Sequence, residues 1–264
     1  MRIFISGGSG FIGGRLAQHL SEAGYSITIG TRKNIKSIQL SKNIIVRNIN
    51  WEENYDLEEV CSENDIIIHA AGMNIKDCYN YPEQALLFNG KKTSEFIKIA
   101  IKKKVKKFIF LSSAHVYSNP MLGNITEETQ LNNSHPYATS NVFGELSLID
   151  ALKKNKITGF ILRVSNGYGI PANEKIDCWG LLVNDLCRQS IQNKKMILKS
   201  KRLEYRDLIS INKILLAIEY LINLKINSDF KNIINLGGGI TLSIVEVANL
   251  IQKRCEILFN YKPD

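Results

Sequence analysis

Short apolar runs alternate along most of the chain with longer segments whose apolar residues recur at helical spacing. The runs predict strands at 2–6, 26–31, 44–49, 65–70, 108–112, 159–164 and 232–236. Residues 65–70 contain three consecutive isoleucines, an unbroken apolar run that is typical of a parallel strand covered on both faces. Strands that alternate with helices predict βαβ units, and we therefore expect an α/β fold with a Rossmann-like, doubly wound parallel sheet.

Helical spacing predicts one helix that begins near Ile12, one within 82–104, and others at 137–153, 181–191, 211–224 and 243–255. Ser243 and Glu246 form a capping-box pattern at the start of the last of these. The alternation of strands and helices weakens after residue 168. We therefore expect 1–168 to form the main domain and 169–264 to form mainly a small C-terminal lobe, with 205–236 returning to the main domain.

The first predicted strand runs directly into a glycine-rich turn and then into a helix. This order is typical of a site for the pyrophosphate of a dinucleotide. Gly7 permits the tight turn, Gly10 lets the phosphates approach the positive helix N-terminus, and Gly13 lets helix and strand pack closely. The alternative is a purely structural turn. The residues expected to bind NAD or NADP here are Gly7, Ser9, Gly10, Phe11, Ile12 and Gly13.

The composition is that of an ordinary globular protein, with 44% hydrophobic and 22% charged residues among 264. No apolar run is long enough to span a membrane, and the first strand begins at the N-terminus and leaves no room for a signal peptide, so we expect a cytoplasmic protein. Five scattered cysteines form no C-x-x-C pair. They indicate reduced thiols, and we expect neither a metal site nor disulfides.

The net charge of +9 comes partly from lysines at 102–104, 106 and 107. These lysines lie at the end of a predicted helix, where they suit the helix dipole and remain solvated. A basic surface also favours a polyanionic substrate such as a nucleotide diphosphate. No nucleic-acid-binding motif accompanies the charge, and we expect no nucleic-acid partner.

Several further motifs follow the glycine turn in a fixed order. They are Asp65–Gly72 (DIIIHAAG), Asn89 with Thr93, Leu111–Tyr117 (LSSAHVY), Pro136-Tyr137, Leu162–Gly169 (LRVSNGYG) and Arg206-Asp207. With them, nearly the whole chain resembles the extended short-chain dehydrogenase/reductase family, of the NAD-dependent epimerase/dehydratase type. The resemblance implies a nucleotide-sugar substrate, hydride transfer at a sugar carbon, a role in polysaccharide biosynthesis, and a homodimer formed through the helices within 83–104 and 137–153.

The resemblance also assigns roles to single residues. Tyr137 is the implied catalytic acid/base, and Ser113 orients the same substrate oxygen. The implied cofactor-binding residues, besides the glycine turn, are Ala70, Ala71, Gly72, Asn89, Leu111 and Tyr137. The implied substrate residues are His115, Asn166 and Arg206. His115 either contacts the sugar, carries a second proton, or has only a packing role.

One position departs from the family pattern. The family motif is Y-x-x-x-K, whereas Tyr137 is followed here by Asn141. The lysine normally lowers the tyrosine pKa and bonds the nicotinamide ribose. Asn141 lies one helical turn on and can still bond a ribose hydroxyl, but it brings no charge. Three outcomes remain open: another cation such as Lys175 substitutes, the enzyme is slow, or the fold serves as a non-catalytic NAD(P)-binding regulator or scaffold.

The end of the second strand indicates which dinucleotide is bound. An acidic residue there selects NAD, but this chain has Arg32 and Lys33. Arg32 suits a 2′-phosphate, so we expect NADP in preference to NAD, unless the two cations only begin a solvated loop.

The reaction is expected to be nucleotide-sugar epimerisation or keto-sugar reduction. Dehydration is disfavoured because Ala114-His115 stands where a dehydratase has an acidic pair. The family continues for several dozen residues beyond the point where this sequence stops, so either the substrate lobe is minimal or the working enzyme is longer.

Overall fold

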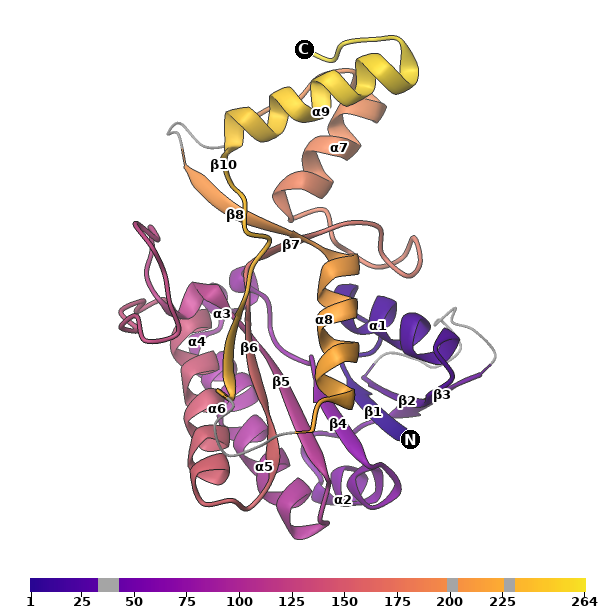
Figure 1. Ribbon diagram of the computed structural model, residues 1–264, viewed down its shortest axis with the longest axis vertical. Helices are drawn as coiled ribbons and strands as arrows, with labels where there is room; N and C mark the ends of the chain where they lie inside the picture. Colours follow the sequence, from indigo (N-terminus) through magenta and orange to yellow (C-terminus); the bar gives the residue numbers. More distant parts are fainter. Residues whose placement is uncertain (33–42, 199–203, 226–230) are drawn as a thin grey trace.

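A seven-stranded parallel sheet forms the centre of the computed structural model, which describes residues 1–32, 43–198, 204–225 and 231–264 (Figure 1). The strand order is β3-β2-β1-β4-β5-β6-β9, and every pair is parallel. The direction of strand addition reverses between β1 and β4, as in a Rossmann sheet. The strands are β1 (Arg2–Ser6), β2 (Ser26–Thr31), β3 (Ile44–Asn48), β4 (Ile66–His69), β5 (Lys107–Ser113), β6 (Thr158–Val164) and β9 (Ile233–Leu236). The predicted doubly wound fold is confirmed.

Helices cover both faces of the sheet. On one face α1 (Phe11–Glu22) and α8 (Ile211–Asn223) pack on alternate strand residues such as Ile3 and Ile5. The opposite face, which includes Phe4, is covered by α2 (Asn54–Glu63), α5 (Thr93–Lys102) and α6 (Pro136–Lys153). Because both faces are buried, the strands are apolar at successive positions, as the isoleucine run indicated.

A small lobe lies beyond the carboxyl end of β6 (Figure 1). It contains helices α7 (Leu182–Asn193) and α9 (Ile244–Phe259), and a sheet of β7 (Asn166–Tyr168), β8 (Tyr205–Ser210) and β10 (Thr241–Ser243) in the order β10-β8-β7. The chain enters the lobe after β6, returns through α8 and β9, and enters it again at β10. The sequence analysis did not predict this sheet, because its strands are short and lack regular alternation.

The helix expected within 82–104 is present between β4 and β5, but it is not α-helical throughout. After α3 (Ile75–Asn80) come α4 (Pro82–Ala85), a π-helix η2 (Leu86–Lys92) and then α5. A Cβ on Gly90 of η2 would lie 3.0 Å from the Phe143 ring, so glycine permits the close approach of η2 to α6. Short π-helices often mark functional sites. No helix in the described part of the chain is long and apolar enough to cross a membrane.

Candidate active site

The glycine turn between β1 and α1 forms a cradle in which residues with a side chain would not fit at the glycine positions. Gly7 has φ +68°, and a Cβ there would lie 2.8 Å from the backbone of Ala70. A Cβ on Gly13 would collide with the Gly7 carbonyl oxygen. Gly10 is the N-cap of α1 and has no side chain that could accept hydrogen bonds from the first amides of the helix. These amides therefore remain for a ligand. This geometry fits a dinucleotide pyrophosphate. Sequence analysis missed Gly8, where a Cβ would collide with Ile29.

A buried histidine supports the wall opposite the turn. The amides of Ala70 and Ala71 both donate to Ser6 Oγ at 3.2 Å, so the Ser6 hydroxyl donates its own proton to His69 Nδ1 at 2.6 Å. The ring then donates from Nε2 to Thr93 Oγ1 at 2.8 Å. Burial lowers the pKa of His69 to about 3, so the ring is neutral. Sequence analysis gave His69 no role, because its partners lie in distant segments.

Asn89 joins this wall to helix α6. Its Oδ1 accepts from Met73 N at 2.8 Å, and its Nδ2 donates to Ser140 Oγ at 3.3 Å. A Cβ on Gly72 would lie 3.4 Å from Asn89 Oδ1. Asn89 is therefore next to the β4 end, in the place where a cofactor-binding residue is expected. Leu111 of β5 packs partly buried against the sheet core.

The end of β2 carries a cation and no carboxylate. Ser9 Oγ lies 3.1 Å from Thr31 Oγ1 and ties the turn to β2. The guanidinium carbon of Arg32 lies 4.8 Å from the centre of the Phe88 ring, and Phe88 packs edge-on against Trp51. Arg32 therefore stands beside the turn. Lys33 lies outside the described residues.

The structure brings the predicted catalytic residues together. Ser113 is the last residue of β5, and Tyr137 is the second residue of α6. The Ser113 hydroxyl lies close enough to the Tyr137 phenol to lower its pKa. Ser113 Oγ also accepts from the amide of His115, whose ring centre lies 6.4 Å from that of Tyr137, edge to face.

The charges around Tyr137 do not favour a phenolate. Burial raises the pKa of Tyr137, the bond with Ser113 lowers it, and the neighbouring Cys78 raises it again. Among the described residues, no cation contributes to this pKa shift, and Lys175 is an exposed residue. Asn141 donates from Nδ2 to the Tyr137 carbonyl oxygen at 2.7 Å. The net pKa of Tyr137 is raised, so the phenol is protonated at neutral pH.

His135 caps the helix that carries Tyr137. Its Nδ1 accepts from the Tyr137 amide at 3.1 Å, and its own amide donates to Asn133 Oδ1 at 3.0 Å. Asn133 also donates to the His115 carbonyl oxygen at 2.6 Å, so the two segments that flank the phenol are joined. Sequence analysis missed this cap, although Pro136 at the first helical position was a signal for it.

Two predicted substrate residues, Asn166 and Arg206, lie on the small sheet, whereas His115 lies on the 3₁₀ helix η3 (Ala114–Val116). Burial, and then the charges of Arg206 and His135, lower the pKa of His115, so Arg206 on β8 lies within electrostatic reach of His115. Arg206 pairs with Glu204 at 2.5 Å. Asn166 on β7 donates to the Asp207 carbonyl oxygen at 3.0 Å. Two of the three predicted substrate residues therefore lie in the lobe, and Arg206 acts electrostatically on the third.

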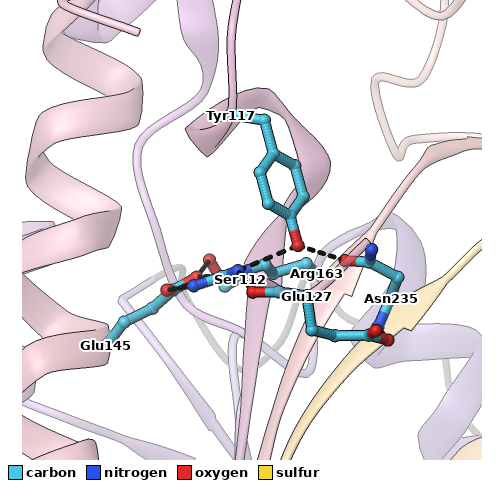
Figure 2. Close-up of polar contacts among 6 residues, drawn as sticks. All are labelled: Ser112, Tyr117, Glu127, Glu145, Arg163 and Asn235. Carbon is cyan, nitrogen blue, oxygen red and sulfur yellow. Dashed lines mark hydrogen bonds and ion pairs between the residues drawn. The ribbon is translucent and has the colours of Figure 1, made fainter. Parts of the chain in front are cut away.

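Sequence analysis also missed a buried ion pair behind the catalytic pair. Figure 2 shows Arg163 of β6 against Glu145 of α6, with Ser112 and Tyr117 beside them. Arg163 stood in a recognised motif, but Glu145 carried no local signal. Among the described residues, no group of histidine, cysteine and acidic side chains is arranged to hold a metal ion.

The parallel sheet, the glycine cradle and the wall at the end of β4 define a dinucleotide-binding protein of the Rossmann class. Residues 3–237 match the model of the NAD dependent epimerase/dehydratase family, and the chain belongs to that family. The resemblance found in the sequence is thereby confirmed.

Named relatives are enzymes that act on nucleotide sugars. The chain is 31% identical to a UDP-glucose 4-epimerase of Caenorhabditis elegans over 59% of this chain and 50% of that protein. It is 25% identical to a UDP-N-acetyl-alpha-D-glucosaminuronate decarboxylase of Bacillus cytotoxicus, over 96% of this chain and 79% of that protein. The match thus spans only about half the length of the worm epimerase.

Solved structures share the fold. A UDP-glucose 4-epimerase of Thermotoga maritima, solved with UDP-glucose, superposes with a TM-score of 0.84. It is 19% identical, and the match covers 96% of this chain and 82% of that one. At this identity the likeness concerns the fold alone.

Proposed function

We propose that this protein is an NAD(P)-dependent nucleotide-sugar epimerase or keto-sugar reductase that transfers hydride at a sugar carbon. The observation that carries this proposal is that Ser113 at the end of β5 and Tyr137 at the start of α6 are brought together at the sheet edge that also holds the glycine cradle. The names of the curated relatives support the same substrate class.

In this proposal the first amides of α1 hold the cofactor diphosphate, and Ala70, Ala71, Gly72, Asn89 and Leu111 line the rest of its path. The bound dinucleotide supplies the hydride acceptor or donor. The Tyr137 phenol exchanges the proton of the substrate hydroxyl, and Ser113 orients that oxygen. Because the phenol is protonated at neutral pH, it is ready to donate to a keto oxygen and acts as a base only at alkaline pH.

Asn166 and Arg206 are proposed to bind the nucleotide-sugar diphosphate from the lobe. The guanidinium of Arg206 suits two phosphate oxygens, although it must then exchange its pairing with Glu204. His115 stands beside the phenol and within electrostatic reach of this arginine, and we propose that it contacts the sugar.

The decisive experiment supplies purified protein with two sets of substrates. An epimerase converts UDP-sugars into their C4 epimers without net cofactor consumption, whereas a reductase consumes NADPH with a nucleotide 4-keto sugar. Tyr137→Phe is expected to lower kcat by about 10²–10⁴-fold. No turnover on any substrate, by folded and cofactor-loaded protein, would contradict the proposal.

A non-catalytic binding role is the weaker alternative. It was suggested by Asn141 alone. The contact between Ser113 and Tyr137 and the enzymatic relatives both favour catalysis.

We further propose that NADP is preferred to NAD. Arg32 stands at the end of β2, where Gly30 and Thr31 offer no carboxylate to a ribose hydroxyl. Fluorescence titration with NADPH and NADH measures this preference. Equal affinity for the two would refute it.

A homodimer and a cytoplasmic location are also proposed. Leu86, Leu87, Phe143 and Leu146 on η2 and α6 are 42–58% exposed, an apolar surface on the helices expected at the interface. Sedimentation velocity measures the assembly. All five cysteines are free thiols, which favours a reducing compartment.

A further inference from the structure

The buried ion pair of Arg163 and Glu145 is more than a core contact. Their side chains are 3% and 1% exposed. Arg163 Nη2 lies 2.6 Å from Glu145 Oε2, and Nε lies 3.1 and 3.2 Å from the two carboxylate oxygens. Burying both ions removes their hydration, and apolar residues of similar volume often stabilise a core equally well. A contribution to stability alone therefore explains this ion pair poorly. The hydrogen bonds that the two residues make to other side chains indicate a further role.

Glu145 connects the two elements that carry the catalytic pair. It lies on α6, about 12 Å along the axis from Tyr137. Its Oε1 accepts from Ser112 Oγ at 2.5 Å, and Ser112 immediately precedes Ser113. The carboxylate therefore ties the helix of the phenol to the strand of the hydroxyl.

Arg163 holds the other end of the same segment. It lies opposite Ser112 in the register of β5 and β6. Its Nη1 donates to Tyr117 Oη at 2.8 Å, and its guanidinium carbon lies 4.9 Å from the centre of the Tyr117 ring (Figure 2). Tyr117 is fully buried and donates to Asn235 Oδ1 at 2.6 Å. Burial raises the pKa of Tyr117, so it remains a phenol that donates.

The segment between these two ends has little regular structure of its own. Ala114–Val116 form a single 3₁₀ turn, η3, and residues 117–135 contain no helix or strand. Ser113 is held by its pairing with Val164 of β6, and Tyr117 bonds through its backbone to Ala114 and Asn132. Between these points regular structure is limited to η3, so side-chain contacts at both ends add to what holds Ser113 and His115 in place.

We propose that Glu145 and Arg163 are positioning residues that clamp residues 112–117 at both ends and so hold the Ser113 hydroxyl against the Tyr137 phenol. The clamp consists of Ser112, Tyr117, Glu145 and Arg163. This inference rests on the function proposed above for Ser113 and Tyr137.

The test removes one arm of the clamp at a time and leaves both charges in place. Ser112→Ala and Tyr117→Phe each delete one hydroxyl. Each is expected to lower kcat about tenfold while the KM for the nucleotide sugar and the Kd of the cofactor stay within twofold, because the reacting groups are displaced and the binding groups are not. A kcat equal to that of the unchanged enzyme would overturn the proposal.

Control variants remove one buried and one partly buried hydroxyl elsewhere. Ser190 is 1% exposed and donates to the Cys187 carbonyl oxygen at 2.8 Å. Tyr25 Oη accepts from Asn223 at 2.7 Å, at the far end of the sheet. Ser190→Ala and Tyr25→Phe are expected to leave kcat unchanged. If they lower kcat as much as the clamp variants do, the effect is general destabilisation and the proposal is wrong.

A second measurement does not depend on turnover. The ¹⁹F chemical shift of 3-fluorotyrosine at position 137 reports the polar surroundings of the phenol, including the nearby Ser113 hydroxyl. Both clamp variants should move and broaden this resonance at neutral pH, whereas the two controls should not. An unmoved resonance contradicts the clamp. A moved resonance in a protein without turnover supports the clamp and contradicts only the proposed function.

Discussion

The cofactor cradle and the start of helix α6 meet at one edge of the sheet, but they are built in different ways. In the cradle, Gly7 and Gly13 are held by direct contact between backbones, which leaves no room for a Cβ. At the start of α6, the backbone of Tyr137 is held by hydrogen bonds with the side chains of His135 and Asn141.

This difference shows which part of the site can change its chemistry. A backbone cradle tolerates almost no substitution, because any side chain occupies the ligand's place or moves the turn. A side chain on α6 can be exchanged without disturbing the fold. Asn141 therefore fits where the family motif has lysine, and it brings no charge to offset the burial that raises the pKa of Tyr137.

The largest effect is expected from closing the cradle. Gly13→Ala places a methyl group against the Gly7 carbonyl oxygen, so α1 or the turn must shift. The Kd of the cofactor should rise about 100-fold, as a strain of roughly 2–3 kcal/mol implies. Gly180→Ala is the control, because a Cβ at Gly180 meets nothing within 4 Å. Unchanged affinity in Gly13→Ala would show that the cradle is more tolerant than its contacts indicate.

An effect of intermediate size is expected on the pH dependence of kcat when the lysine of the family motif is restored at position 141. Oxidation of an alcohol requires the phenolate, so its rate should rise with pH towards the raised pKa of Tyr137. In Asn141→Lys the ammonium favours the phenolate and lowers the pKa of Tyr137. The pH range over which the oxidation rate rises should therefore lie about 1–3 pH units lower than in the unchanged enzyme. The measurement is the pH profile of kcat for oxidation.

Thr139→Lys adds the same charge to the exposed side of the same helix and should leave the pH range of the rate rise unchanged. If the pH range of Asn141→Lys is also unchanged, side-chain charge on α6 does not control the pKa of the phenol. The inferred difference between the cradle and the start of α6 would then be wrong.

The smallest effect concerns the cap of α6. His135→Ala removes the acceptor of the Tyr137 amide and should lower the stability by about 1 kcal/mol. His135→Asn supplies a standard cap and should restore the stability. Thermal unfolding with a shift of about 2–4 °C measures the difference. Equal melting temperatures for the two variants would show that the cap bond contributes nothing.

Much of the site was predictable because its signals are local. The glycine turn follows its strand directly, and Ser113 and Tyr137 stand at the ends of elements that hydrophobic spacing alone predicts. The residues that support them were not predictable. His69 depends on Ser6, 63 positions away, and its neutral state follows only from complete burial.

The sequence by itself determined the parallel sheet, the cradle and the order of the candidate catalytic residues, because apolar periodicity and glycine turns act over a few neighbouring positions. Only the tertiary structure decided the π-helix η2, the small sheet and the clamp. Arg163 and Glu145 are 18 residues apart, and Tyr117 and Asn235 are 118 apart. Such contacts leave no periodic trace in the chain, since packing and the satisfaction of buried polar groups select them only after the elements have come together.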